Sequence, residues 1–126
     1  MYQEITEQDF IDMYGTLLER LDPRLILFAQ SPAKDLVGFC LAYPDVANVE
    51  LQQFILKSLA VEPDSGGLGI GSLLVGETHR IAQELNLING GIHAFMWDGS
   101  LSRKISAHAG QPIRQYALFS KRLDIA

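Results

Sequence analysis

One loop constrains this chain more than any other feature, because it joins an apolar strand to an amphipathic helix through residues that are nearly all glycine. The strand is the run 54–61, and the helix is predicted from Gly71 to Asn86, where apolar residues recur at helical spacing. The loop between them, 66–72, has four glycines, which can take positive φ and let a ligand approach the main chain. Since the first N–H groups of a helix are free and lie at the positive end of its dipole, the junction predicts an anion site for phosphate.

Three phosphate-binding signatures can be compared with this loop. The segment from Gly66 to Ser72 has the outer frame of a P-loop, but it has no lysine to reach the terminal phosphates, which argues against nucleoside triphosphatase chemistry. A dinucleotide fingerprint needs G-x-G-x-x-G, whereas Gly71 comes one position early here. A nucleotide-binding oxidoreductase fragment is therefore only a third alternative.

The third signature is motif A of the Gcn5-related N-acetyltransferases, which reads V-x-P, a short variable run, Q/R-x-x-G-x-G/A and an apolar helix start. Val61, Pro63, Gly69 and Gly71 fall on this motif, and the resemblance extends over most of the chain. The Gln or Arg that opens the loop signature in the family is Gly66 here. Backbone donors alone are therefore expected to hold the anion.

The resemblance implies an acetyl-CoA site between two central parallel strands, 54–61 and 92–97, that splay apart. The main-chain groups of Leu59, Ala60 and Val61 would pair with the pantetheine amides, and an N–H near Ala60 or Val61 would face the carbonyl oxygen. The pyrophosphate would be held by the loop residues Gly66, Gly67, Leu68, Gly69, Ile70, Gly71 and Ser72. Ser102 and Arg103, on the first turn of the next helix, are expected contacts to the CoA arm, although Arg103 also fits a solvated helix end.

The second family landmark is an Asn and a Tyr ahead of a glycine, and Gly110 fixes their positions in this chain. Counting back from it, Ser106 stands at the Tyr position and Gly99 at the Asn position. A thiol of pKa about 8.5 leaves readily as an anion, so the missing Tyr does not forbid catalysis. Ser106 could donate a proton through water, and His108 or Tyr116 could substitute for it if they face the cleft. His108 is also typical of a surface residue at a helix end.

The general base is harder to assign from the sequence. The strand before V-x-P has no carboxylate at the place where some relatives have a Glu. Glu50 precedes that strand and Asp98 follows the next one, so both are candidates, although each also fits a solvated loop charge. A water relay is the default expectation, and no metal ligand set is predicted.

Composition limits the possible function classes. A chain of 126 residues with 48% hydrophobic residues predicts a single domain over residues 1–126, which can also be the C-terminal part of a longer protein. The net charge of −5 argues against a nucleic-acid partner and suits a cationic amine. No apolar run approaches the roughly 20 residues of a membrane span, so no membrane association and a cytoplasmic location are expected. The single cysteine, Cys40, lies in an apolar run and is predicted to be a small buried residue.

The predicted element order gives an α/β (α+β) fold. A helix is expected from Thr6 to Leu21, and the later elements are strands 24–30, 36–43 and 54–61, helix 71–86, strand 92–97, helix 100–109 and a closing strand 113–123, with Tyr116 in the core. The resemblance implies a mixed, mostly antiparallel sheet with splayed central parallel strands flanked by helices. The family's first strand, which precedes the first helix, is missing here. An exposed sheet edge at that place would invite pairing between subunits, so a homodimer is left open.

The leading hypothesis is an acetyl-CoA-dependent N-acetyltransferase that acts on a primary amine by direct attack in a ternary complex. The acceptor, a small molecule or a peptide, cannot be identified from the sequence. The rival hypothesis is a catalytically degenerate CoA-binding or regulatory module, since the usual Tyr, Asn, Gln/Arg and Glu are all absent.

Overall fold

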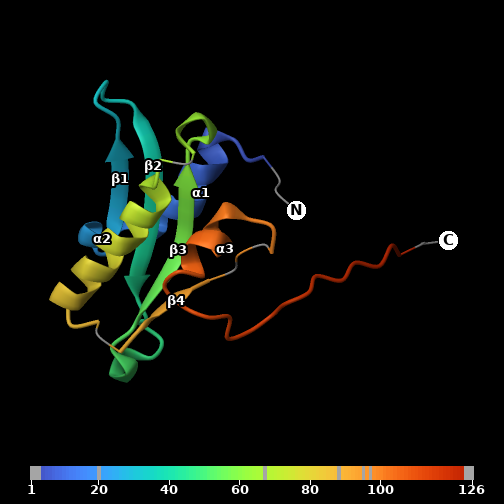
Figure 1. Ribbon diagram of the computed structural model, residues 1–126. Coiled ribbons are helices and arrows are strands. Elements are labelled where there is room, and N and C mark those ends of the chain that lie inside the picture. The colour runs from blue at the N-terminus through green and yellow to red at the C-terminus, as the bar shows by residue number, and fades with distance from the viewer. Residues whose placement is uncertain are drawn as a thin grey trace.

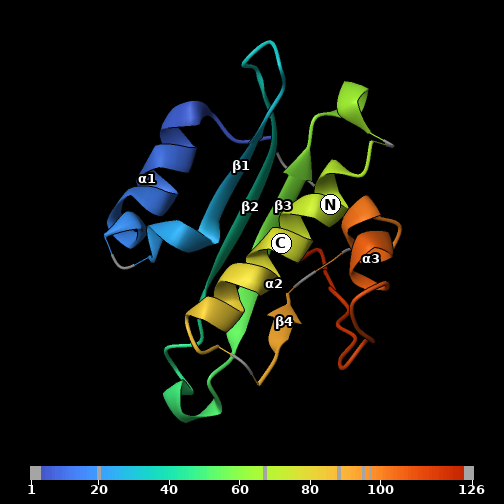
Figure 2. The ribbon, with the colours of Figure 1, turned by 60° about the vertical axis from the view of Figure 1, so that its left-hand side comes forward.

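A four-stranded mixed sheet lies between helices in the computed structural model, which describes residues 4–19, 21–66, 68–87, 89–94, 96 and 98–123. The strand order is β1 (Ile26–Gln30), β2 (Leu36–Pro44), β3 (Phe54–Val61) and β4 (Gly91–His93). The first two pairs are antiparallel and β3 pairs with β4 in parallel, as predicted. Helices α1 (Glu7–Leu18) and α2 (Ile70–Glu84) lie on opposite faces of the sheet (Figures 1 and 2).

Helix α2 supplies Leu74, Val75 and Ala82 to the core cluster because one of its faces packs on the sheet. Thr78 is fully buried, and its hydroxyl donates to the Leu74 carbonyl at 2.9 Å, which satisfies the polar group inside the core. Cys40 of β2 is also fully buried, with its Sγ 3.4 Å from the Thr78 hydroxyl, so the prediction of a buried cysteine is confirmed. The core cluster consists of Leu25, Cys40, Ala42, Phe54, Leu56, Leu74, Val75 and Ala82.

Helix α1 has a strong start but little burial. Thr6 is the N-cap: its hydroxyl accepts from the Asp9 N–H, and the Asp9 carboxylate accepts from the Thr6 N–H, each at 3.1 Å. The helix therefore begins where the sequence predicts. None of its residues is buried, however, and Phe10 and Leu17 on its apolar face are exposed. The capping box thus fixes the helix locally, while the apolar face is left largely uncovered.

A β-bulge in β3 breaks the regular pairing with β2. Leu41 lies opposite Ser58 and Ala42 lies opposite Leu56, so Lys57 is an extra residue on β3. Such a bulge bends its strand and increases the local twist. The bend comes immediately after the point where β3 and β4 stop pairing, and it therefore helps to separate the two strands.

Several element boundaries differ from the sequence prediction. Residues 23–25 form a 3₁₀ turn, because the Asp22 side chain caps the Arg24 N–H, and β1 starts only at Ile26. In the described part of 91–97, the strand is limited to Gly91–His93, and Trp97 lies outside the described residues. The last helix, α3, spans Leu101–Ser106 and continues as a turn through Ala109. No strand precedes α1 within residues 4–6.

The predicted closing strand, 113–123, is wrong for this structure. Residues 111–123 form no helix or strand and extend away from the sheet (Figure 1). Tyr116 is 68% exposed, so its predicted place in the core is also wrong. The physical reason is that a strand needs a neighbour to satisfy its backbone, and this segment leaves the domain beyond β4 instead of returning to it. None of the helices in the described part of the chain has the length and apolarity needed to span a bilayer.

Candidate functional site

The central parallel strands open into a V. Pairing runs from Phe54 opposite Gly91 to Leu56 opposite His93, and the last hydrogen bond joins the Ala94 N–H to the Leu56 carbonyl at 3.0 Å. Beyond this point no described residue of 95–97 is paired with β3, which continues to Val61, and α3 takes the facing position. The predicted splaying of these strands is therefore confirmed.

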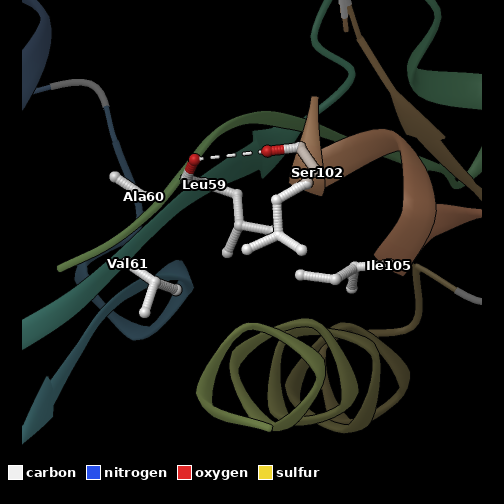
Figure 3. Close-up of a pocket in the computed structure, with 6 residues that line it drawn as sticks. Leu59, Ala60, Val61, Ser102 and Ile105 are labelled. Atoms are coloured by element: carbon white, nitrogen blue, oxygen red, sulfur yellow. Dashed lines mark hydrogen bonds between the residues drawn. The ribbon is translucent and has the colours of Figure 1, made fainter. Parts of the chain in front are cut away.

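A cleft of about 220 Å³ lies in this opening, and Figure 3 shows residues that line it. It is lined by Leu59, Ala60, Val61, Leu101, Ser102 and Ile105. The Ser102 hydroxyl donates to the Leu59 carbonyl at 3.5 Å across the cleft, while the Glu62 N–H donates to Val37 of β2 at 2.8 Å. Because backbone polar groups alternate between the two sides of a strand, Leu59 and Val61 direct theirs toward the cleft and Ala60 directs its own toward β2.

A second hollow of about 180 Å³ continues the cleft to the N-terminus of α2. The two share Val61, Leu101 and Ile105, so they form one groove. The second part is lined in addition by Ser65, Gly66, Gly69, Ile70, Gly71 and Ser72. The structure thus brings the glycine loop and the end of β3 together, as the sequence predicts.

Within the described residues, the N-terminus of α2 offers this groove backbone donors that have no backbone acceptor. The first helical hydrogen bond runs from the Leu73 N–H to the Gly69 carbonyl at 2.9 Å, so the N–H groups of residues 70–72 precede the helical ladder. Gly69 is the N-cap with φ +75°, and no side chain caps the helix there. A Cβ at Gly69 would meet no atom within 4 Å. Open space beside backbone donors and a dipole end suits an anionic group.

Gly71 also has a packing role, which the sequence does not indicate. A Cβ on Gly71 would lie only 2.4 Å from the Cδ1 of Ile105. Gly71 is buried, so its lack of a side chain lets α3 pack closely on the first turn of α2. Sequence reasoning missed Ile105 and Leu101, whose only signal is their i, i+4 apolar spacing on a short helix.

Of the remaining predicted contacts, the described ones are not among the residues that line the groove. Leu68 is 75% exposed, and Gly67 lies outside the described residues. Arg103 makes an ion pair with Asp98 at 3.4 Å, and both side chains are largely exposed. Glu50, in a 3₁₀ turn, and His108, after α3, are exposed too. None of the candidate acid or base residues Glu50, Asp98, Ser106 and His108 is brought to the groove wall.

Ser106 instead ends a chain of hydrogen-bonded side chains behind the groove. Its hydroxyl lies 2.6 Å from Nδ1 of His93, and Nε2 of His93 lies 3.1 Å from Nε2 of His79. Burial lowers the pKa of both imidazoles, and the neighbouring His79 lowers that of His93 further. These hydrogen-bonded side chains connect α3, β4 and α2. The sequence placed His93 in a strand but did not indicate its two partners.

The groove therefore has a defined chemistry. Its lining combines exposed main-chain groups of β3, free helix N–H groups, aliphatic side chains and the hydroxyls of Ser65, Ser72 and Ser102. No Lys or Arg lines either part, and no cluster of three or more His, Cys, Asp or Glu suitable for a metal is found among the described residues. Such a groove suits a long ligand with amide groups along an arm and an anionic group at one end.

Comparison with solved structures identifies the fold. The chain is similar to an aminoglycoside antibiotic 6'-N-acetyltransferase from Acinetobacter haemolyticus, with 19% identity, a TM-score of 0.68, and coverage of 98% of this chain and 86% of that one. It is also similar to Ard1 from Thermoplasma volcanium, with 16% identity, a TM-score of 0.67, and coverage of 91% and 70%. A ribosomal-protein-alanine N-acetyltransferase from Brucella melitensis biovar Abortus 2308 gives 19% identity, a TM-score of 0.64, and coverage of 97% and 82%.

No protein-family model matches the sequence, and no curated protein matches it either. At these levels of identity, the structural similarities establish the fold and leave the activity to be argued from the groove. The chain has the fold of the Gcn5-related N-acetyltransferases, as the sequence resemblance predicts. Its open V between β3 and β4 lies beside the glycine loop, as that resemblance also implies.

Proposed function

We propose that this protein is an acetyl-CoA-dependent N-acetyltransferase that acts on a primary amine in a ternary complex. The observation that carries the proposal is the continuous groove between the unpaired end of β3 and the uncapped N-terminus of α2. Residues 70–72 would donate N–H groups to the pyrophosphate, and the main chain of Leu59 and Val61 would pair with the pantetheine amides. Acetyl-CoA would supply the acetyl thioester that the amine attacks.

The chain's own groups suggest how the reaction would be assisted. The N–H of Val61 or Leu59, which faces the cleft, would stabilise negative charge on an acetyl carbonyl oxygen, whereas that of Ala60 faces β2. The deprotonation of the amine would use water, because no carboxylate of the described residues lines the groove. The acceptor would be a small molecule or a peptide amine, which fits the net charge of −5. A cytoplasmic location belongs to the same proposal.

A second candidate is a CoA-binding or regulatory module without catalysis. It is favoured by one specific observation: Ser106, at the position of the family's Tyr, is bonded to His93 and is not part of the groove lining. Both candidates predict CoA binding, so binding and transfer must be measured separately.

The test compares a substitution at the N-terminus of α2 with a control substitution within the same helix. Gly69→Glu adds a carboxylate beside the anion site at a positive-φ position, whereas Gly76→Glu adds it at an exposed position where a Cβ meets nothing within 4 Å. We expect CoA binding by calorimetry in the parent and in Gly76→Glu, and a loss of at least about 100-fold in Gly69→Glu, with all three folded by circular dichroism. Equal binding by both variants, or no heat from the parent at millimolar CoA, would refute the site.

Transfer is then assayed by thiol release from acetyl-CoA across a panel of amines. Cys40 is buried and adds little background to a thiol reagent. Release that depends on one amine supports the enzyme. If CoA binds but no amine of the panel causes thiol release, the result supports a CoA-binding module without catalysis.

A further inference from the structure

Two half-buried histidines from different elements share one hydrogen bond, and we call them the histidine pair. His79 of α2 and His93 of β4 have their Nε2 atoms 3.1 Å apart, and their rings are nearly perpendicular, at 88°. Nδ1 of His93 lies 2.6 Å from the hydroxyl of Ser106 on α3. The His79 ring also meets the buried ring of Phe54 in an edge contact. The pair is therefore enclosed by α2, β3, β4 and α3.

The number of protons on the pair decides whether its hydrogen bonds can form. An imidazole nitrogen donates when it carries a proton and accepts when it does not. In the neutral pair, and after the uptake of one proton, one Nε2 can still donate to the other, so both hydrogen bonds persist. When both imidazoles are protonated, neither Nε2 can accept, and two cations face each other at 3.1 Å. A second proton therefore replaces the hydrogen bond between the histidines with repulsion.

No carboxylate among the described residues offsets this repulsion. Burial lowers the pKa of both imidazoles, and His79 lowers the pKa of His93 further. The charged side chains of the surrounding elements are paired with one another or exposed to water. They are Glu77, Arg80 and Glu84 on α2, Lys57 on β3, Asp98 after β4, and Arg103 and Lys104 on α3.

Ser106 connects the pair to the wall of the groove. It is the last residue of α3, and Ser102 and Ile105 of the same helix point into the cleft (Figure 3). Ile105 also packs on Gly71 at the start of α2, beside the free N–H groups. A helix of six residues is not stable by itself and depends on such contacts. The position of the wall therefore depends on the hydrogen bond between Ser106 and His93.

We propose that the histidine pair is a pH-sensitive switch: a second proton on the pair releases α3 from β4 and thereby weakens CoA binding in the groove. The released state binds that proton more readily, so a fall in pH shifts the equilibrium toward it. Because the two imidazoles are coupled, the apparent pKa values belong to the pair. The effect on CoA rests on the proposed function, whereas the release of α3 can be measured without any ligand.

The first test is an NMR titration of the ¹⁵N-labelled protein without CoA, from about pH 8 to about pH 5. We expect the imidazole signals of His79 and His93 to change below about pH 6.5, and the amide signals of α3 to change with the second step. His79→Gln keeps a hydrogen-bonding group that cannot be protonated, so its α3 signals should stay constant. His108→Gln is the matched control, because His108 is exposed after α3, and it should behave like the parent.

The parent titration decides this part even if His79→Gln does not fold. Signals of α3 that stay constant while the pair titrates would overturn the proposal. The same would follow if the signals of β1 and β2 changed together with those of α3, because the whole domain would then unfold.

The second test measures CoA binding by calorimetry at about pH 7.5 and about pH 5.5. We expect the parent and His108→Gln to bind at least about 10-fold more weakly at the lower pH, and His79→Gln to change by less than about twofold. Ionisation of the CoA phosphates changes in the same range, but it affects all three proteins equally. Equal or tighter binding by the parent at the lower pH would overturn the link to the groove. No binding at either pH would refute the CoA site itself, while the NMR titration would still decide the release of α3.

Discussion

Gly91 is the position where a single added methyl group should disturb the fold most directly. A Cβ at Gly91 would lie 2.3 Å from Cζ of the Phe54 ring, 2.6 Å from Cε1 and 2.8 Å from Cε2. The ring is 2% exposed, and its centroid lies 5.2 Å from that of the His79 ring in an edge contact, so it cannot withdraw without displacing α2. Overpacking of this kind costs about 1–3 kcal/mol. For a domain of 126 residues, each kcal/mol lowers the Tm by roughly 3–5 °C.

The same substitution elsewhere provides the control. Gly76 is in α2, and a Cβ there would meet nothing within 4 Å, so Gly76→Ala should gain about 0.5–1 kcal/mol from helix propensity. Thermal and urea unfolding of Gly91→Ala and Gly76→Ala should therefore move in opposite directions. Phe54→Leu in the Gly91→Ala background should recover part of the loss, since the smaller side chain relieves the contact. If Gly91→Ala were as stable as the parent, the packing of β4 against Phe54 would be wrong.

Three other substitutions or conditions give separate checks. Burial raises the pKa of the Cys40 thiol, so Ellman's reagent should react with it slowly in the folded protein and at once in denaturant. Burial lowers the pKa of His79 and His93 below 6.5, so these histidines bind protons more readily in the unfolded chain than in the folded protein. The folded protein should therefore lose stability as the pH drops below about 6.5 and regain it as the pH rises. Between pH 5 and 8, the Tm of His79→Gln should depend less on pH than the Tm of the parent. Thr6→Ala should destabilise α1 by about 1 kcal/mol and reduce the helical ellipticity at 222 nm. The Tm of the protein should change less, because no residue of α1 is buried. A loss of Tm as large as the loss of ellipticity would contradict this.

Local signals were sufficient to predict most elements from the sequence. The cap at Thr6, the apolar runs of β2 and β3 and the helical spacing of α2 depend on neighbouring residues, and the structure confirms each element within one or two residues at most ends. The glycine loop is also recognisable because glycine adopts a positive φ, such as the +75° at Gly69, without the steric cost of a Cβ atom.

Other features depend on contacts between distant segments, which a single sequence does not contain. The bulge at Lys57 follows from the pairing of β3 with β2, and nothing in the local pattern indicates it. Ser106 was expected at the reacting groups, but His93 lies 2.6 Å from it and turns it into a link between elements. The segment 113–123 has strand composition, yet composition does not say which sheet edge it will meet.

The separation of binding from catalysis follows from which atoms line the groove. Main-chain groups of Leu59, Val61 and residues 70–72 are set by the sheet, by the bulge and by the start of α2, so they persist whatever side chains occupy the family's catalytic positions. This chain has Gly66 where the family has Gln or Arg, so one side-chain contact to an anion is absent while the backbone donors remain in place. This chain has Ser106 where the family has Tyr, so a proton donor is absent, but the groove wall that Leu101 and Ile105 form is not altered. The proposed CoA binding therefore rests more directly on the fold than the proposed acetyl transfer, in which water would have to accept the proton of the amine.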